Sequence, residues 1–154
     1  MILRGVIPWV SLALVGARAA TLAAMLDYRE GHDVDLVQLA ELFRSVGWGP
    51  KPGGADALAR MVKGSLWVVS AWEGARLVGF VRAMSDGVTT AYVTSVVVAE
   101  DVRHRGIATE LIRRLLAEKD DVQFVLRADP PLHPFYRSLG FGDPTNVLVR
   151  PRRA

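Results

Sequence analysis

The chain has 154 residues, of which 51% are hydrophobic and 23% are charged, a balance typical of one globular domain and not of a disordered chain. It contains no cysteine, which excludes disulfide bonds, a thiol nucleophile and thiolate metal ligands. The net charge is +3, but the sequence has no wide stripe of basic residues with aromatic residues between them. We therefore expect no nucleic-acid partner.

Residues 1–24 differ from the rest of the chain, because thirteen uncharged residues separate Arg4 from Arg18. This stretch is shorter than the roughly 20 apolar residues that a membrane span needs, so we expect no membrane span. A basic start, an apolar middle and the sequence Ala17-Arg18-Ala19 imitate a signal peptide. We favour an over-long reading frame with a start at Met25, which makes residues 1–24 an atypical apolar extension. A docking extension and an export signal are the alternatives.

The first half of the remaining chain predicts a strand, two helices and then three further strands. The first strand is expected at 26–30, the first helix at 33–45 with Asp33 as its N-cap, and the second helix at 55–62. Between these helices, residues 47–54 contain two prolines and four glycines, which predicts a loop. The further strands are expected at 66–72, 77–84 and 89–98, with turns at 73–76 and 85–88.

A buried strand followed by a charged turn and a helix is the most informative segment. The three consecutive valines 96–98 favour a strand. From Ile107 onward the apolar residues repeat with a helical period, which predicts a helix in the region 103–119. The turn Arg103-His104-Arg105-Gly106 falls where this helix begins, and a helix N-terminus with a glycine beside it suits a diphosphate. Simple turn chemistry at Gly106 is the alternative.

The end of the chain predicts a strand at 122–127, a helix at 132–139 and a last strand at 147–150 that closes the sheet. Gly140 is placed directly after that helix, where it can end it. A right-handed crossover through the preceding helix makes the strands at 89–98 and 122–127 parallel neighbours.

The pattern Arg103-x-x-Gly106-x-Ala108 after a valine-rich strand resembles the acyl-CoA-binding motif of the GNAT superfamily of N-acetyltransferases. A second segment, Phe135-Tyr136-x-Ser138-Leu139-Gly140-Phe141, resembles a later helix of the same family and follows in the expected order. The resemblance extends from about Leu26 to the C-terminus. It implies an α/β (α+β) GNAT domain over residues 25–154, with a mixed six- to seven-stranded sheet flanked by about four helices.

The resemblance implies acetyl-CoA as the acetyl donor. Matching the family motifs to positions in this chain implies which residues contact it. Backbone groups of the strand meet the pantetheine arm, and the turn and first helical residues hold the diphosphate. The residues so implied are Val96, Val97, Val98, Arg103, His104, Arg105, Gly106, Ile107, Ala108, Thr109 and Phe135. Tyr136 aligns with a tyrosine that acts as general acid near the cofactor sulfur, and a phenol with a pKa of about 10 is protonated at neutral pH. Packing of the last helix is the alternative role for Tyr136.

The sequence says less about the acceptor and the general base. Trp48 lies in the loop where such folds bind the amine, and Tyr92 and Thr94 are candidates to face the cleft and order a water. Asp129 lies just past a strand end and is a candidate base, although an aspartate before two prolines is usually a turn residue. His133 precedes the last helix and is expected to cap it; reaching the mouth of the site as a base is the alternative. The histidines lack metal-ligand spacing, so we expect no metal.

The implied function is transfer of an acetyl group from acetyl-CoA to a primary amine of a small-molecule acceptor, by direct attack, in the cytoplasm. A protein lysine or N-terminal acetyltransferase is one alternative; it would need a groove lined by acidic residues such as Asp27, Glu30, Asp33 and Asp35. A catalytically silent acyl-CoA-binding module that regulates a partner is the other. A homodimer is the expected oligomer, because two-fold dimers are the commonest assembly.

Overall fold

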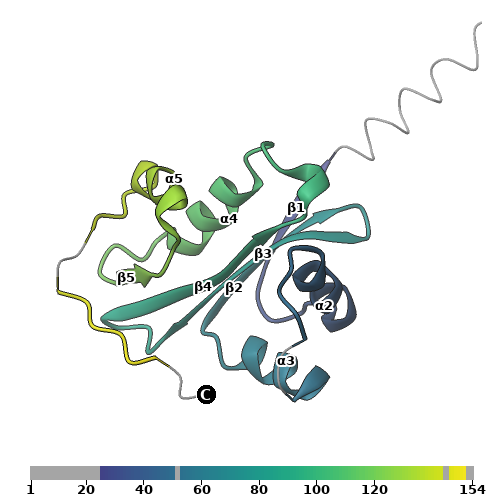
Figure 1. Cartoon of the computed structure of the whole chain (residues 1–154), viewed down its shortest axis with the longest axis horizontal. Helices are drawn as coiled ribbons and strands as arrows, with labels where there is room; N and C mark the ends of the chain where they lie inside the picture. Colours follow the sequence, from purple (N-terminus) through teal and green to yellow (C-terminus); the bar gives the residue numbers. More distant parts are fainter. Residues whose placement is uncertain (1–24, 51–52, 144–145, 152–154) are drawn as a thin grey trace, which may run out of the picture.

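A mixed sheet runs through the centre of the structure, and its strands follow the order of the chain (Figure 1). The computed structural model describes residues 25–50, 53–143 and 146–151. The strands are β1 (Leu26–Glu30), β2 (Trp67–Glu73), β3 (Arg76–Ser85), β4 (Thr90–Val98) and β5 (Gln123–Leu126). Strands β1 to β4 pair antiparallel, whereas β5 pairs parallel with β4. The predicted parallel crossover is therefore confirmed.

The helices cover both faces of this sheet (Figure 1). They are α2 (Leu36–Ser45), α3 (Gly54–Lys63), α4 (Ile107–Leu116) and α5 (His133–Ser138), and short 3-10 turns η1 (Glu100–Val102) and η2 (Pro130–Leu132) precede α4 and α5. Figure 1 shows α2 and α3 on one side of the sheet and α4 and α5 on the other. The order of elements that the resemblance to the GNAT family implies is thus present from β1 to α5, with four helices and with five strands in the described sheet in place of the expected six to seven.

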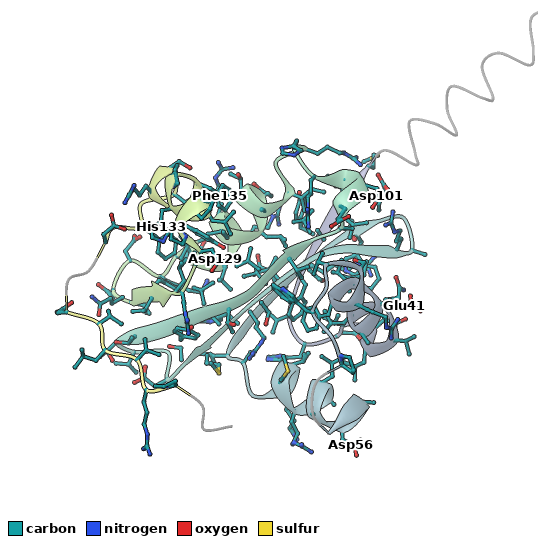
Figure 2. All side chains as sticks on the ribbon, in the orientation of Figure 1. Glu41, Asp56, Asp101, Asp129, His133 and Phe135 are labelled. Carbon is teal, nitrogen blue, oxygen red and sulfur yellow. The ribbon has the colours of Figure 1, made fainter. Side chains whose placement is uncertain are left out.

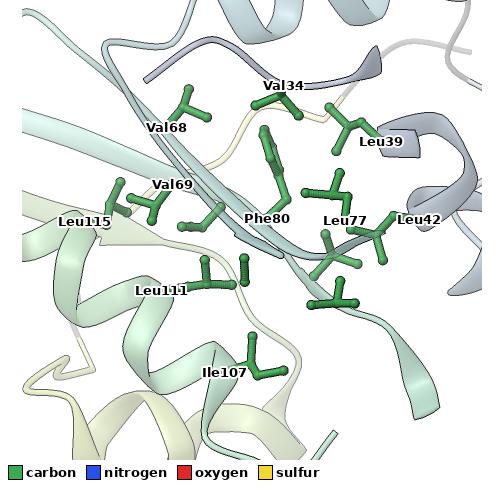
Figure 3. Close-up of a cluster of buried hydrophobic side chains, with 14 of the residues drawn as sticks. Val34, Leu39, Leu42, Val68, Val69, Leu77, Phe80, Ile107, Leu111 and Leu115 are labelled. Carbon is green, nitrogen blue, oxygen red and sulfur yellow. The ribbon is translucent and has the colours of Figure 1, made fainter. Parts of the chain in front are cut away.

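Side-chain alternation along β3 explains how the two helical layers pack. Phe80 is fully buried on the α2 side, where its ring lies 6.1 Å from that of Phe43. Gly79 faces α4, and a Cβ added there would lie 3.0 Å from side-chain atoms of Ile107 and Leu111. Figure 3 shows Phe80 on the side of Leu39, with Ile107 and Leu111 on the opposite side. The absent side chain at Gly79 therefore lets α4 lie close against the sheet.

Helix ends differ from the prediction at two places. Asp35, and not Asp33, is the N-cap of α2, and its carboxylate accepts hydrogen bonds from the backbone N–H groups of Val37 and Gln38 at 2.9 and 3.1 Å. The bond from Gln38 is the main cause that lowers the pKa of Asp35. The helix was predicted to begin at Asp33. In the structure the next residue, Val34, is buried in the core, and the helix begins only after it. The helix predicted in the region 103–119 begins only at Ile107, because a turn precedes it.

The predicted strand at 147–150 is wrong for the residues that the structure describes. Residues 146–151 contain no strand, so the described sheet has five strands and β5 forms its edge. Val147, Leu148 and Val149 are exposed, with 50%, 98% and 63% of their surface accessible. A hollow of about 1660 Å³ lies between this segment, β5 and α5. An apolar run of suitable length thus does not fix a strand unless a neighbouring edge pairs with it.

The N-terminal extension of residues 1–24 lies outside the described residues. Among the helices that are described, none has the length and apolar character needed to cross a bilayer.

Candidate active site

An opening between β4 and β5 is the central feature of the site. Strand β5 pairs with β4 only from Thr90 to Val93, where Val93 lies opposite Leu126. Strand β4 continues through Thr94–Val98 while β5 has ended. These five residues span roughly 16 Å of extended chain. One edge of β4 therefore carries backbone groups that no strand of the described sheet pairs with.

The direction of these backbone groups follows from the ladder between β3 and β4. The N–H of Ala99 donates to the carbonyl of Val78 at 2.9 Å, so Ala99 faces β3. Because backbone groups alternate sides along a strand, those of Val98 and Val96 face the opening. The side chain of Val97 is buried in the core. The opening thus offers main-chain donors and acceptors to an extended ligand, which is how proteins bind an added strand.

The start of α4 provides a cluster of free backbone donors beside this opening. His104 and Gly106 both have positive φ, of 63° and 77°, and they turn the chain sharply into the helix. In the described structure, the N–H groups of residues 104 to 109 have no backbone or side-chain acceptor. Such donors, together with the positive end of the helix dipole, form a site for an anion. The turn thus lies at the helix start, as predicted, while its role in binding a diphosphate stays a prediction.

Two ion pairs tie this turn to the distant β2–β3 hairpin. Arg105 donates to Glu73 at 2.8 Å, and Arg76 donates to both carboxylate oxygens of Asp101 at 2.6 and 2.8 Å. The hydrogen bonds from Arg76 lower the pKa of Asp101. These pairs are not apparent from the sequence, because their members lie 32 and 25 residues apart. Much of the charge of Arg105 is therefore balanced within the protein, and this residue positions the turn.

Arg103 is also engaged, although more loosely. Its Nη1 lies 3.7 Å from a carboxylate oxygen of Glu100, and its Nε donates to the carbonyl of Val98 at 3.4 Å. Its side chain is nearly half exposed. Long, exposed contacts of this kind contribute little to stability, so Arg103 can turn toward an anion at small cost.

Tyr136 lies on α5 with its ring buried and its hydroxyl unbonded. The ring packs edge-on against Phe135 and Phe141, with centroids 5.0 and 5.9 Å away. The hydroxyl has no hydrogen-bond partner in the described chain, which also contains no buried side-chain polar atom without a partner. The hydroxyl therefore reaches the surface. Burial of the ring raises the pKa of Tyr136, so the phenol is protonated at neutral pH.

Three of the candidate acceptor residues lie on the α2–α3 face of the sheet. Thr94 lies opposite Arg82 in the ladder and Tyr92 lies opposite Met84, so these four side chains share one face. The ring of Trp48 lies 5.4 Å from that of Phe43, which contacts Phe80 of this face. The structure thus brings Trp48, Tyr92 and Thr94 to one side of the sheet.

Asp129 lies elsewhere, before α5. Its side chain is exposed and makes no cap hydrogen bond, while its carbonyl accepts from the N–H of Leu132 at 2.9 Å. The ring of His133 lies 3.2 Å from the carbonyl of Ala128. Figure 2 shows Asp129, His133 and Phe135 near one another beside α5. Asp129 therefore behaves as a turn residue here. No group of acidic or histidine side chains within the described ranges is arranged to hold a metal ion.

A polar pair at a β-bulge in β4 was not predicted from the sequence. The register between β3 and β4 shifts between Phe80 and Arg82, so Ser95 and Val96 together lie opposite one residue. Ser95 has a φ of 58°, unusual for a residue with a side chain. The Nε of Arg82 donates to the Ser95 hydroxyl at 3.1 Å. The available signal was one arginine inside an otherwise apolar strand.

Comparison with known proteins agrees with this geometry. A model of the acetyltransferase (GNAT) family matches residues 34–141. The chain belongs to the GNAT family of acetyltransferases. A histone acetyltransferase from Glycine max is 33% identical over 135 residues, covering 78% of this chain and 58% of that protein. A chloroplastic serotonin N-acetyltransferase from Oryza sativa is 32% identical over 127 residues, covering 77% of this chain and 62% of that protein.

Solved structures show the same fold. A GNAT family acetyltransferase from Streptococcus pneumoniae has a TM-score of 0.68 at 24% identity, covering 84% of this chain and all of that chain. A predicted acetyltransferase from Clostridium acetobutylicum, solved with acetyl-CoA, has a TM-score of 0.60 at 20% identity, covering 82% and 96%. This chain spans about three-fifths of the length of the two plant relatives. The names of these two plant relatives state different acceptors, a histone and serotonin. Acetyltransferase activity is therefore common to them, whereas the acceptor differs.

The unbonded hydroxyl of Tyr136 generates a prediction about stability. Tyr136→Phe should change the free energy of unfolding by no more than about 0.5 kcal/mol, because it removes no protein contact. Tyr136→Ala should cost about 3–5 kcal/mol, because it leaves a cavity between two aromatic rings. Urea unfolding followed by circular dichroism measures both. A loss above 1 kcal/mol in the phenylalanine variant would show that the hydroxyl has a structural partner.

Proposed function

We propose that this chain transfers an acetyl group from acetyl-CoA to a primary amine of a small-molecule acceptor by direct attack. The observation that carries the proposal is the unpaired edge of β4 beyond Val93, which leads directly to the free backbone donors at the start of α4. An extended arm ending in a diphosphate has the shape and charge that these two features together can bind.

The proposed contacts to acetyl-CoA extend along this path. Backbone groups of Val96 and Val98 pair with the amides of the pantetheine arm, and the N–H groups of 104 to 109 bind the diphosphate. Arg103 and Arg105 add positive charge there, Arg105 less so because Glu73 already pairs with it. Phe135, half-buried beside Tyr136, contacts the apolar part of the arm.

Acetyl-CoA supplies the thioester that an amine attacks. In the proposed reaction, Tyr136 donates its phenolic proton to the departing sulfur, and its raised pKa keeps that proton available at neutral pH. Tyr92 and Thr94 order a water that carries away the proton of the amine. Asp129 is a weaker candidate for that role, because its side chain is exposed to solvent before α5. Positioning of the amine against the thioester supplies a large share of the rate.

The acidic residues near the N-terminus favour a small acceptor over a protein. Asp27 pairs with Arg29 at 2.7 Å, and Asp35 caps α2. Two of the four carboxylates that an acidic groove for a basic peptide would need therefore serve local structure. The free hydroxyl of Tyr136 favours catalysis over a silent binding module, since a phenylalanine would pack equally well. A cytoplasmic location and a homodimer stay as predictions.

Gly106 provides a test of the proposed cofactor site. Gly106→Ala should weaken acetyl-CoA binding about tenfold or more, because a methyl group would intrude among the donors and cost a charge-assisted hydrogen bond. Gly47→Ala is the matched control: Gly47 has a φ of 79° against 77° at Gly106, and neither would bring a Cβ within 4 Å of another atom. Both variants should lose about 1–2 kcal/mol of stability from backbone strain. Equal acetyl-CoA affinity in the two variants, measured by calorimetry, would refute the assignment.

Tyr136 provides the test of the reaction. The full chain is assayed for release of free thiol from acetyl-CoA over a panel of primary amines, with Tyr136→Phe alongside. We expect amine-dependent release that falls by about 10²-fold in the variant, while acetyl-CoA affinity is unchanged. Equal rates in the two proteins would rule out Tyr136 as general acid. Folded protein that binds acetyl-CoA but releases no thiol with any amine would favour a macromolecular acceptor or the silent module.

A further inference from the structure

Arg82 is a half-buried arginine that has no acidic partner. Its Nε donates to the Ser95 hydroxyl at 3.1 Å, and its Nη1 lies 3.2 Å from the Ser65 hydroxyl and 3.5 Å from the carbonyl of Met61. All of these acceptors are neutral. Within the described chain no carboxylate lies within ion-pair distance of Arg82. By contrast, carboxylates pair with the arginines at positions 29, 76, 103, 105, 113, 114 and 137.

An arginine in this setting retains an unbalanced positive charge. Burial lowers the pKa of Arg82, yet a guanidinium stays charged in proteins. Removing part of a charge from water without a counter-charge is costly, so such a group usually has a partner. Nη2 of Arg82 has no acceptor in the described structure, where every buried side-chain polar atom has one. Nη2 therefore reaches solvent and is open to a ligand.

The position of Arg82 connects this charge to the proposed reaction. Arg82 lies opposite Thr94, the first residue of β4 beyond the paired ladder, and it holds the bulge residue Ser95. This is the end of the opening away from the turn that starts α4, and it is where the thioester of a bound arm would lie. The guanidinium also shares its face with Tyr92 and Met84, which are 39% and 41% exposed. That face is therefore accessible beside the arginine.

The nearby charges do not neutralise Arg82. The last turn of α3, whose Met61 carbonyl it contacts, carries Arg60 and Lys63 and no acidic residue. The ring of His32 lies 2.6 Å from the carbonyl of Ser65, whose hydroxyl contacts Arg82. The surroundings of Arg82 are thus neutral or basic, which favours a negative group.

We propose that Arg82 binds an anionic group of the acceptor, a carboxylate or a phosphate, and so selects amines that carry such a group near the reacting nitrogen. This inference rests on the proposed function. A planar guanidinium donates to two oxygens of either group at once. Anchored there, the acceptor presents its amine beside Thr94 and Ser95, where the acetyl group lies.

A structural role alone would not need the charge. Arg82 links β3 to the end of α3 through Ser65 and Met61, and an uncharged donor can make such links. Ser65 is itself buried and donates to the carbonyl of Met61 at 2.9 Å, so this junction is held without Arg82. The two roles therefore differ in how the effect of a substitution depends on the charge of the acceptor.

The experiment compares kcat/KM for matched acceptors with the full chain. One pair is an amino acid and its carboxamide, tested for several side chains; the other is an amino sugar 6-phosphate and the unphosphorylated sugar. Values are expressed per neutral amine, because removing a neighbouring carboxylate lowers the pKa of the ammonium. We expect the anionic member of at least one pair to be preferred about 10- to 100-fold, the effect of one charge-assisted contact. The pair that shows it identifies the group as carboxylate or phosphate.

Variants then assign the preference to Arg82. Arg82→Gln should remove it by lowering kcat/KM for the anionic member only, and Arg82→Lys should keep part of it. Ser65→Ala removes a contact of Arg82 but leaves its charge, so it should keep the preference. Acetyl-CoA affinity should be the same in all four proteins, and a thermal melt confirms that each is folded.

Three results would overturn the inference. The first is a wild-type protein that prefers neither member of any pair. The second is an Arg82→Gln variant in which kcat/KM falls equally for both members of a pair. The third is a failure of the anionic acceptors to bind at all. If no amine is turned over, the proposed function fails, and titration of the anionic acceptors into protein loaded with CoA decides separately about Arg82. Saturable binding that Arg82→Gln abolishes would support the anion site, and absence of binding would refute it.

Discussion

The end of the parallel ladder at Val93 and Leu126 is the constraint on which the rest of the site depends. Strand β5 ends at Leu126 after four residues, and the chain enters the 3-10 turn η2 at Pro130, where proline has no N–H to donate to a ladder. Beyond Val93, strand β4 pairs with β3 only, and it bulges at Ser95, which adds local twist. Backbone groups that would otherwise be paired are left available. Both the cofactor path and the acceptor face begin at this point.

The opening between β4 and β5 can bind an extended ligand with a terminal anion only if the turn before α4 stays at the end of the opening near Val98. Residues distant in the sequence hold the turn there. The ion pairs Arg105–Glu73 and Arg76–Asp101 hold the turn and η1 to the β2–β3 hairpin. Close packing of α4 at Gly79 fixes the helix that follows. Each exposed ion pair alone contributes little to stability. Their effect here is on position, because together they limit how the free N–H groups move relative to β4.

The sequence predicted those parts of the site that depend on local pattern. The period of the apolar residues located α4, the three valines located β4, and the crossover rule made β4 and β5 parallel. It wrongly predicted Asp33 in place of Asp35 as the cap of α2, because the position of the cap depends on where Val34 enters the core. It also placed a strand at 147–150, since apolar composition does not reveal whether an edge is in register to pair.

The proposed role of Arg82 could not be predicted from the sequence for a related reason. That role depends on the register between β3 and β4. The register places Arg82 opposite Thr94 and beside the bulge at Ser95. In the proposed function the sheet separates two tasks: the β4–β5 edge and the start of α4 would bind the donor, while the α2–α3 face would meet the acceptor. Relatives with different acceptors can keep the first part and change the second.

Amide hydrogen exchange with and without acetyl-CoA tests this account most directly. We predict that acetyl-CoA slows exchange at the N–H groups of Val96 and Val98 and at those of residues 104 to 109. The amides of Thr90–Val93 should not change, because β5 already pairs with that part of β4. Protection confined to the outer edge of β5, beside the hollow that Tyr136 and Leu148 line, would contradict the account.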